Sequence, residues 1–168
     1  MRILVLGLLG PLCAAAQKVD VEFDPSIQFA KYRTFAIRDG RLNSQDPRLN
    51  SELVKKRIEF DIQKYFEGRK LVFVASGPAD LNVRYTLGAV RGAQREAYPA
   101  GWRGWGTRVV RVPFTEGTLV IDLRDAGTRG LVWRAIAREE KSNAEKVESK
   151  LDDMVKKSVE KYPPKGKK

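Results

Sequence analysis

The chain has 168 residues, 42% of them apolar, which is enough for one globular domain with a core of its own. It has no histidine and a single cysteine, Cys13. Ser-His-Asp and Cys-His catalysis, zinc bound by histidine, and histidine-bound haem are therefore excluded. The net charge of +11 bears on partners and solubility rather than on the fold. It can indicate an anionic partner, or it can be a basic surface that is simply solvated.

Residues 1–16 have the pattern of a secretory signal peptide. Arg2 is followed by a short apolar stretch and then by three alanines, which end at Ala16. The apolar stretch is too short for a permanent transmembrane helix. We expect cleavage after Ala16 and a location in the periplasm or at the outer membrane. The mature chain would lack cysteine altogether, and loss of Arg2 would reduce its charge from +11 to +10. Lipidation of Cys13 is the alternative, and membrane association is expected only in that case.

Residues 17–162 are expected to form one domain. Short segments that alternate apolar and polar side chains, or are bounded by turn residues, predict strands. These segments are residues 18–23, 31–37, 70–75, 79–87 and 108–114. Asp39 and Gly40 are expected to end the second strand, while the third and fourth are expected to pair directly or through another strand. Between residues 88 and 106, five glycines and Pro99 predict irregular structure.

The strongest local signal is a β-hairpin near the end of the domain. Two apolar runs, residues 119–123 and 131–137, flank an Asp-Ala-Gly-Thr-Arg-Gly turn. Successive side chains alternate between the two faces, so one face of the pair can be dry and the other partly wet. Leu131 and Trp133 are expected on the dry face, with Trp133 as its anchor.

Two segments have apolar residues at helical spacing. Asp46 and Pro47 favour the start of a helix over residues 47–67. Ser142 and Glu145 form a capping box that predicts a second helix over residues 142–162. Residues 163–168 are expected to be a disordered basic tail. The predicted fold is α+β, with a mainly antiparallel sheet of about six strands and the two helices packed mostly on one face.

Several separated motifs resemble one bacterial family. They are Asp24-Pro25, residues 29–36, residues 79–83, residues 116–125 and residues 131–134. Together they resemble the domain-of-unknown-function 4136 family over nearly the whole mature chain. The resemblance implies an exported cell-envelope protein, often a lipoprotein, with an α+β fold and no established activity.

A segment rich in aromatic residues and arginine is the candidate binding site. Tryptophan and tyrosine rings stack on flat groups, and arginine binds phosphate or carboxylate through two hydrogen bonds. The candidate residues are Tyr98, Trp102, Arg103, Trp105, Arg108 and Arg111. The alternative is a long hairpin connection whose tryptophans pack onto the edge of the domain.

Carboxylates are the only plausible catalytic acids, and glycoside hydrolysis needs two of them at a defined separation. The candidates Asp80, Asp122, Asp125, Glu139 and Glu140 are interpreted more simply as turn, cap and surface residues. We therefore expect no enzymatic activity, no cofactor and no metal. The predicted function is a cell-envelope binding or assembly module that contacts an anionic glycan, a lipid headgroup or a protein. The alternative is a carboxylate-dependent hydrolase of envelope polysaccharide. Nucleic acid is not an expected partner, because the chain carries an export signal and no aromatic RNA-binding strand motif.

Overall fold

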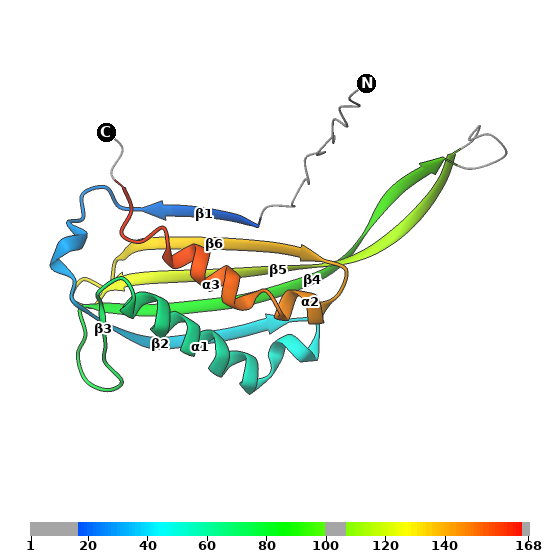
Figure 1. Ribbon diagram of the computed structural model, residues 1–168. Helices are drawn as coiled ribbons and strands as arrows, with labels where there is room; N and C mark the ends of the chain where they lie inside the picture. The colour runs from blue at the N-terminus through cyan, green and yellow to red at the C-terminus, as the bar shows by residue number, and fades with distance from the viewer. Residues whose placement is uncertain (1–16, 100–106, 166–168) are drawn as a thin grey trace, which may run out of the picture.

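The computed structural model describes residues 17–99 and 107–165, and six strands of this part form one sheet in the order β1-β6-β5-β4-β2-β3 (Figure 1). The strands are β1 (Lys18–Phe23), β2 (Thr34–Ser44), β3 (Val72–Phe73), β4 (Leu81–Pro99), β5 (Thr107–Asp125) and β6 (Leu131–Lys141). The helices are α1 (Glu52–Glu67), α2 (Ala144–Glu148) and α3 (Leu151–Val159), with 3-10 turns η1 (Phe29–Lys31) and η2 (Pro47–Asn50). The helices lie across one face of the sheet, which confirms an α+β fold with its helices on one side.

The sheet is mixed, so the prediction of a mainly antiparallel sheet was wrong. The strand pairs β1–β6, β6–β5 and β5–β4 are antiparallel, whereas β2 is parallel to both β4 and β3. The physical reason is helix α1, which carries the chain from β2 back across the sheet, because a crossover of this kind returns the next strand in parallel. The predicted strands near residues 70–75 and 79–87 do not pair directly. Both pair with β2, which lies between them, and this is one of the two arrangements expected.

Strand β2 is longer than predicted and begins later. Residues 29–31 form η1, and the strand then runs through Asp39 and Gly40 to Ser44. A β-bulge at Arg38 interrupts the register with β4. Gly40 lies beneath the ring of Tyr85, which would overlap any Cβ at this position. Gly40 therefore allows the Tyr85 ring to pack closely against the backbone within β2, and it does not end the strand.

Strands β4 and β5 pair along their whole length, from Leu81 opposite Asp125 to Pro99 opposite Thr107. The prediction of irregular structure was wrong for residues 88–99, and the predicted strand at residues 108–114 is continuous with the hairpin strand. Each strand supplies the backbone hydrogen-bond partners that the other needs, so several glycines are tolerated. Residues 90–99 and 107–114, here called the ribbon, extend beyond β2 and β6 and project from the sheet (Figure 1).

The first predicted helix begins later than expected, and the second is divided into two. Asp46 caps η2 rather than a long helix, and Ser51 caps α1 by accepting a 3.2 Å hydrogen bond from the backbone N–H of Val54. The second helix is broken into α2 and α3 at Ser149 and Lys150. Its cap is Asn143, which accepts a 3.0 Å hydrogen bond from the N–H of Lys146, so the predicted capping box at Ser142 was wrong.

The core lies between the sheet and the helices, with Trp133 fully buried in it as predicted. The Trp133 ring packs edge-on against Phe66 of α1 and Tyr162 after α3, with ring centroids 6.3 and 5.9 Å away. Leu131 does not share this environment, since a register shift at Leu123 and Arg124 leaves Leu131 36% exposed. No helix of the described residues is long and apolar enough to cross a membrane.

Candidate functional site

The face of the sheet opposite the helices is open and largely charged. Alternate residues of each strand point away from the core, because strand side chains alternate. The outward-facing residues of the central strands include Asn82, Arg84, Asp122, Arg124, Arg134 and Arg138. Two carboxylates on this face are paired: Arg134 holds Asp122 through hydrogen bonds of 2.7 and 2.8 Å, and Arg138 contacts Asp20 at 2.8 Å. The hydrogen bonds that Arg134 donates to Asp122 raise the pKa of Arg134.

Four arginines meet in one depression of about 530 Å³ on this open face. Its lining residues are Arg38, Asn82, Arg84, Arg124, Ala126 and Arg129, and we call it the arginine depression. They come from the bulge of β2, the start of β4, the end of β5 and the β5–β6 turn. No carboxylate belongs to the lining. The depression therefore concentrates positive charge, which favours an anion.

Two of these arginines are held in place by uncharged acceptors. The Nε of Arg38 donates to Oδ1 of Asn82 at 3.3 Å, and its Nη2 donates to the carbonyl oxygen of Gly77. The Nη1 of Arg124 donates to the carbonyl oxygen of Arg129 at 3.1 Å. Arg129 has a positive φ of 60°, a left-handed turn conformation that directs this carbonyl toward Arg124. These contacts orient the guanidinium groups without neutralising them.

The remaining donors of the depression are unused within the described part of the chain. The Nε of Arg124 is buried and has no hydrogen-bond partner there. The guanidinium groups of Arg84 and Arg129 make no hydrogen bond or ion pair with residues 17–99 or 107–165. A buried donor without a partner is costly, so a ligand that accepts from Arg124 would be favoured.

Two carboxylates lie beside Arg84 on neighbouring strands but are already occupied. Asp39 and Asp122 are its cross-strand neighbours in β2 and β5. Asp39 forms an ion pair with Arg41 at 3.3 Å, and Asp122 is held by Arg134. Arg84 thus keeps its charge for an external partner.

Of the predicted binding residues, Tyr98, Arg108 and Arg111 lie at the other end of β4 and β5 from the arginine depression. Tyr98 and Arg108 are opposite each other in the ribbon backbone, although their side chains are outside the described residues. Trp102, Arg103 and Trp105 also lie outside the described residues. Arg111 is exposed on the ribbon, directly opposite Arg95. The structure therefore brings together two arginines of this region and leaves the aromatic part of the prediction untested.

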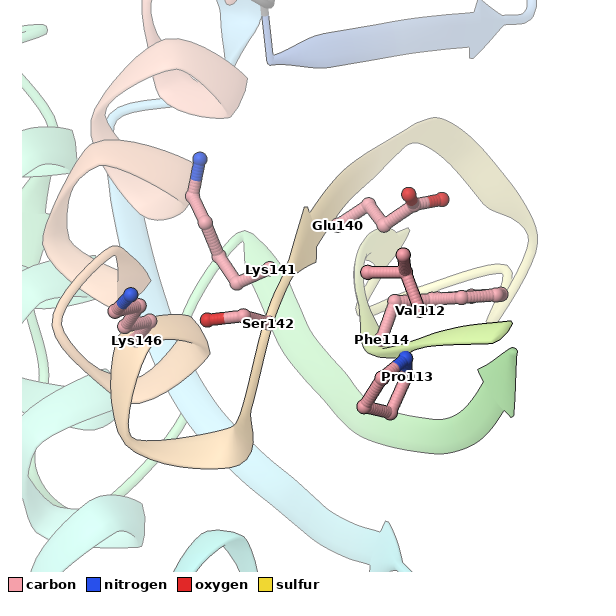
Figure 2. Close-up of a pocket in the computed structure, with 7 residues that line it drawn as sticks. All are labelled: Val112, Pro113, Phe114, Glu140, Lys141, Ser142 and Lys146. Atoms are coloured by element: carbon pink, nitrogen blue, oxygen red, sulfur yellow. The ribbon is translucent and has the colours of Figure 1, made fainter. Parts of the chain in front are cut away.

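A second depression, of about 300 Å³, lies at the base of the ribbon (Figure 2). Its lining residues are Val112, Pro113, Phe114, Glu140, Lys141, Ser142 and Lys146. Lys141 is paired with Glu139, a carboxylate that is nearly buried. The mixed charge of this lining makes it a less specific anion site than the arginine depression.

Asp80 and Asp125, considered as catalytic carboxylates only in the alternative, have structural roles. Asp125 holds the hairpin turn by accepting from the N–H of Thr128 and the hydroxyl of Tyr32, both at 2.9 Å. These hydrogen bonds, that of Thr128 first, hold the pKa of Asp125 well below its usual range. Asp80 accepts from the backbone N–H groups of Arg33 and Thr34, which lower its pKa in the same way.

Few carboxylates line the surface depressions formed by described residues. Each of four surface depressions formed by described residues contains at most one carboxyl side chain, either Glu140 or Glu160. Among the described residues, no group of three aspartate, glutamate, histidine or cysteine side chains is placed to hold a metal ion.

The fold defines the class to which this chain can be assigned: an α+β domain with a mixed sheet and helices on one face. The chain belongs to the family described as "Domain of unknown function (DUF4136)", whose profile matches residues 19–164. This match confirms the family that the separated motifs indicated. No curated protein matches the chain.

Solved structures share the fold at low sequence identity. A PDZ domain protein from Parabacteroides distasonis is similar with a TM-score of 0.61 and 13% identity over 88% of this chain, which spans only 35% of that protein. The PelC dodecamer from Paraburkholderia phytofirmans gives a TM-score of 0.51 and 12% identity, covering 86% of this chain and 95% of that one. A putative neuraminyllactose-binding hemagglutinin homolog from Helicobacter pylori gives 0.49 and 8%, covering 80% and 87%. At such identities the likeness concerns the fold alone.

Proposed function

We propose that the protein is a non-catalytic binding module of the cell envelope that takes an anionic ligand in the arginine depression. The observation that carries the proposal is the set of four guanidinium groups around one depression without a carboxylate. Guanidinium groups bind carboxylates and phosphates through paired hydrogen bonds, and here two are oriented and two are free. The signal-peptide pattern of residues 1–16, which predicts export, is consistent with the envelope as the place of action.

The arginine depression replaces the ribbon as the favoured site. Arg95 and Arg111 lie opposite each other on the ribbon, but like charges in this position repel, and no described depression contains them. The depression offers oriented donors and a concave lining instead. A concave lining excludes more water from a bound ligand than an exposed two-stranded ribbon does.

Three charge-matched variants test the site. Arg84→Gln/Arg129→Gln removes two free guanidinium groups from the depression, and Arg95→Gln/Arg111→Gln removes two from the ribbon. Arg48→Gln/Arg57→Gln removes two surface arginines that pair with Glu145 and Glu148, and it serves as the control. Binding of polyphosphate and polygalacturonate is measured by calorimetry in low-salt buffer.

The proposal predicts that only the depression variant loses affinity, by about tenfold or more, because each lost charge-assisted hydrogen bond contributes about 1.5–3 kcal/mol. Equal affinity in all three variants would indicate non-specific attraction to a basic protein. Loss in the ribbon variant alone would return the site to the predicted region and contradict the proposal.

A further inference from the structure

We infer that the arginine depression recognises a phosphate-bearing group, either a phosphomonoester or a diphosphate, rather than a carboxylated glycan. The inference rests on the proposed anion-binding function and specifies its ligand. The shared chemistry is a compact anion with more than one negative charge and several terminal oxygens. Such a group can belong to a lipid headgroup or to a soluble phosphate ester.

The first argument is the amount of charge. A single carboxylate is satisfied by a single guanidinium, as the Asp122–Arg134 pair on the same sheet face shows. The depression offers four such groups, and none of them is paired with a carboxylate of the described residues. A phosphomonoester carries about −1.5 to −2 charges at neutral pH and three strong acceptor oxygens, so it matches several guanidinium groups at once.

The second argument is the direction of the available donors. Arg38 and Arg124 are fixed by hydrogen bonds to neutral oxygens, and the Nε–H of Arg124 has no acceptor among the described residues. Because the Oδ1 of Asn82 already accepts from Arg38, its amide NH₂ is left to donate. The exposed guanidinium groups of Arg84 and Arg129 and the amide of Asn82 thus border one concave space, and a tetrahedral group can accept from different directions as a planar carboxylate cannot.

The third argument is what the lining lacks. Its single apolar residue is Ala126, and it contains no aromatic side chain. Sugar rings and nucleobases are commonly held on aromatic faces, and no such platform is present among these residues. Recognition is therefore confined to the charged group itself. The volume of about 530 Å³ exceeds what one free phosphate needs, which leaves room for a substituent or a second phosphoryl group.

Calorimetry with defined probes tests the ligand class. The probes are inorganic pyrophosphate, glycerol 3-phosphate and a galacturonate oligomer, each titrated into the wild type, Arg84→Gln/Arg129→Gln and Arg48→Gln/Arg57→Gln. We expect pyrophosphate to bind the wild type and the control equally, and the depression variant about tenfold or more weakly. The galacturonate oligomer should bind more weakly than pyrophosphate. Circular dichroism checks that the variants, changed at exposed arginines, keep the fold.

Failure of the inference and failure of the proposed function are distinguishable. If galacturonate binds through Arg84 and Arg129 as tightly as pyrophosphate or more tightly, the phosphate assignment is overturned while anion binding at this site stands. If no probe binds, or if the depression variant binds every probe as the wild type does, both are overturned.

A second experiment distinguishes a lipid headgroup from a soluble phosphate ester. Co-sedimentation is measured with phosphatidylcholine vesicles, with and without phosphatidic acid. Binding that needs phosphatidic acid, is displaced by pyrophosphate and is lost in the depression variant identifies a lipid headgroup. Pyrophosphate binding without vesicle binding identifies a soluble phosphate ester. Vesicle binding that persists in the depression variant would contradict lipid recognition by these arginines.

Discussion

Arg134 grips both carboxylate oxygens of Asp122, at 2.7 and 2.8 Å, on the side of the sheet that carries the arginine depression. Asp122 is also the direct cross-strand neighbour of Arg84. Side chains in such positions have Cβ atoms about 4.5–5.5 Å apart, so a released Asp122 would be within reach of Arg84. Arg134 therefore keeps Arg84 available for a ligand without contacting the depression itself.

Removing the ion pair between Arg134 and Asp122 is predicted to weaken anion binding indirectly. In Arg134→Gln, Asp122 turns to Arg84 and competes with the ligand, so the affinity for pyrophosphate falls severalfold. The double variant Asp122→Asn/Arg134→Gln removes the competitor and restores the affinity. Calorimetry of both variants checks this, and equal affinities in the single and the double variant would refute the competition.

The identity of Arg124 as an arginine is predicted to matter beyond its charge. Arg124→Lys keeps the positive charge but loses the Nε–H donor that has no partner among the described residues. Lysine also lacks the planar fork that makes paired hydrogen bonds to phosphate. Affinity for pyrophosphate should fall about tenfold or more, in line with the loss of one charge-assisted hydrogen bond. Wild-type affinity in this variant would show that the site needs only a positive charge at residue 124.

The core depends on Trp133, which is fully buried against Phe66 and Tyr162. Trp133→Ala is predicted to lower the free energy of unfolding by about 3–5 kcal/mol. Trp133→Phe should cost less than half as much, because it keeps an aromatic ring and removes an indole N–H that is buried without an acceptor among the described residues. Urea unfolding followed by circular dichroism measures both, with the half-exposed Leu131→Ala as a mild control. Equal losses for the two Trp133 variants would contradict the packing described.

Helix α2 is predicted to need a glycine beneath it. A Cβ at Gly117 of β5 would overlap the side chain of Val147 in α2. Gly117→Ala should therefore destabilise the protein by about 1–3 kcal/mol, the usual cost of overpacking a core. Val147→Ala alone also destabilises, yet the double variant should be more stable than the sum of the two changes predicts. Strict additivity in a double-mutant cycle would argue against the contact.

Asp61 of α1 is predicted to make stability fall as the pH rises. Burial and then the negative charge of Asp152 raise the pKa of Asp61 from 3.8 to about 6. The folded protein therefore holds a proton that the unfolded chain releases between about pH 4 and pH 6, and stability declines across this window by about 2–3 kcal/mol. Asp80 and Asp125 have lowered pKa values and act with the opposite sign at lower pH, so a comparison with a variant is needed.

Asp61→Asn is that variant, because it keeps the shape and removes the titration. It should abolish the decline between pH 4 and pH 6 and be more stable than the wild type at pH 7. Urea unfolding at several pH values measures the difference. Identical pH profiles for the two proteins would show that Asp61 titrates normally in the folded state.

The parts of the fold that could be predicted depend on local pattern. The hairpin at residues 119–137 and the burial of Trp133 follow from alternating side chains around a six-residue turn. The parallel pairing of β2 with β4 depends instead on how α1 crosses the sheet, which no local pattern encodes. Residues 88–99 were predicted to be irregular because their glycines were treated as strand breakers, whereas pairing with β5 satisfies the backbone of β4 at Gly88 and Gly92.

The candidate site was missed for a related reason. Arg84 and Arg124 stand on the polar side of predicted strands, which indicated only exposure. Their meeting with Arg38 and Arg129 follows from the strand order and from a bulge in β2, and neither is visible in the sequence. The aromatic and arginine segment stood out because its residues are close in the chain, although closeness in sequence does not make a concave site.

The most direct test of the account is nuclear magnetic resonance of the arginine Nε–H groups during titration with pyrophosphate. The account predicts that the Nε–H resonances of Arg84, Arg124 and Arg129 shift saturably along one binding curve, with the hydrogen exchange of Arg84 and Arg129 slowed. Arg48 and Arg57, on the helix-covered side, should remain unchanged. Small, unsaturable shifts spread evenly over all arginines would contradict the claim that this depression is a binding site.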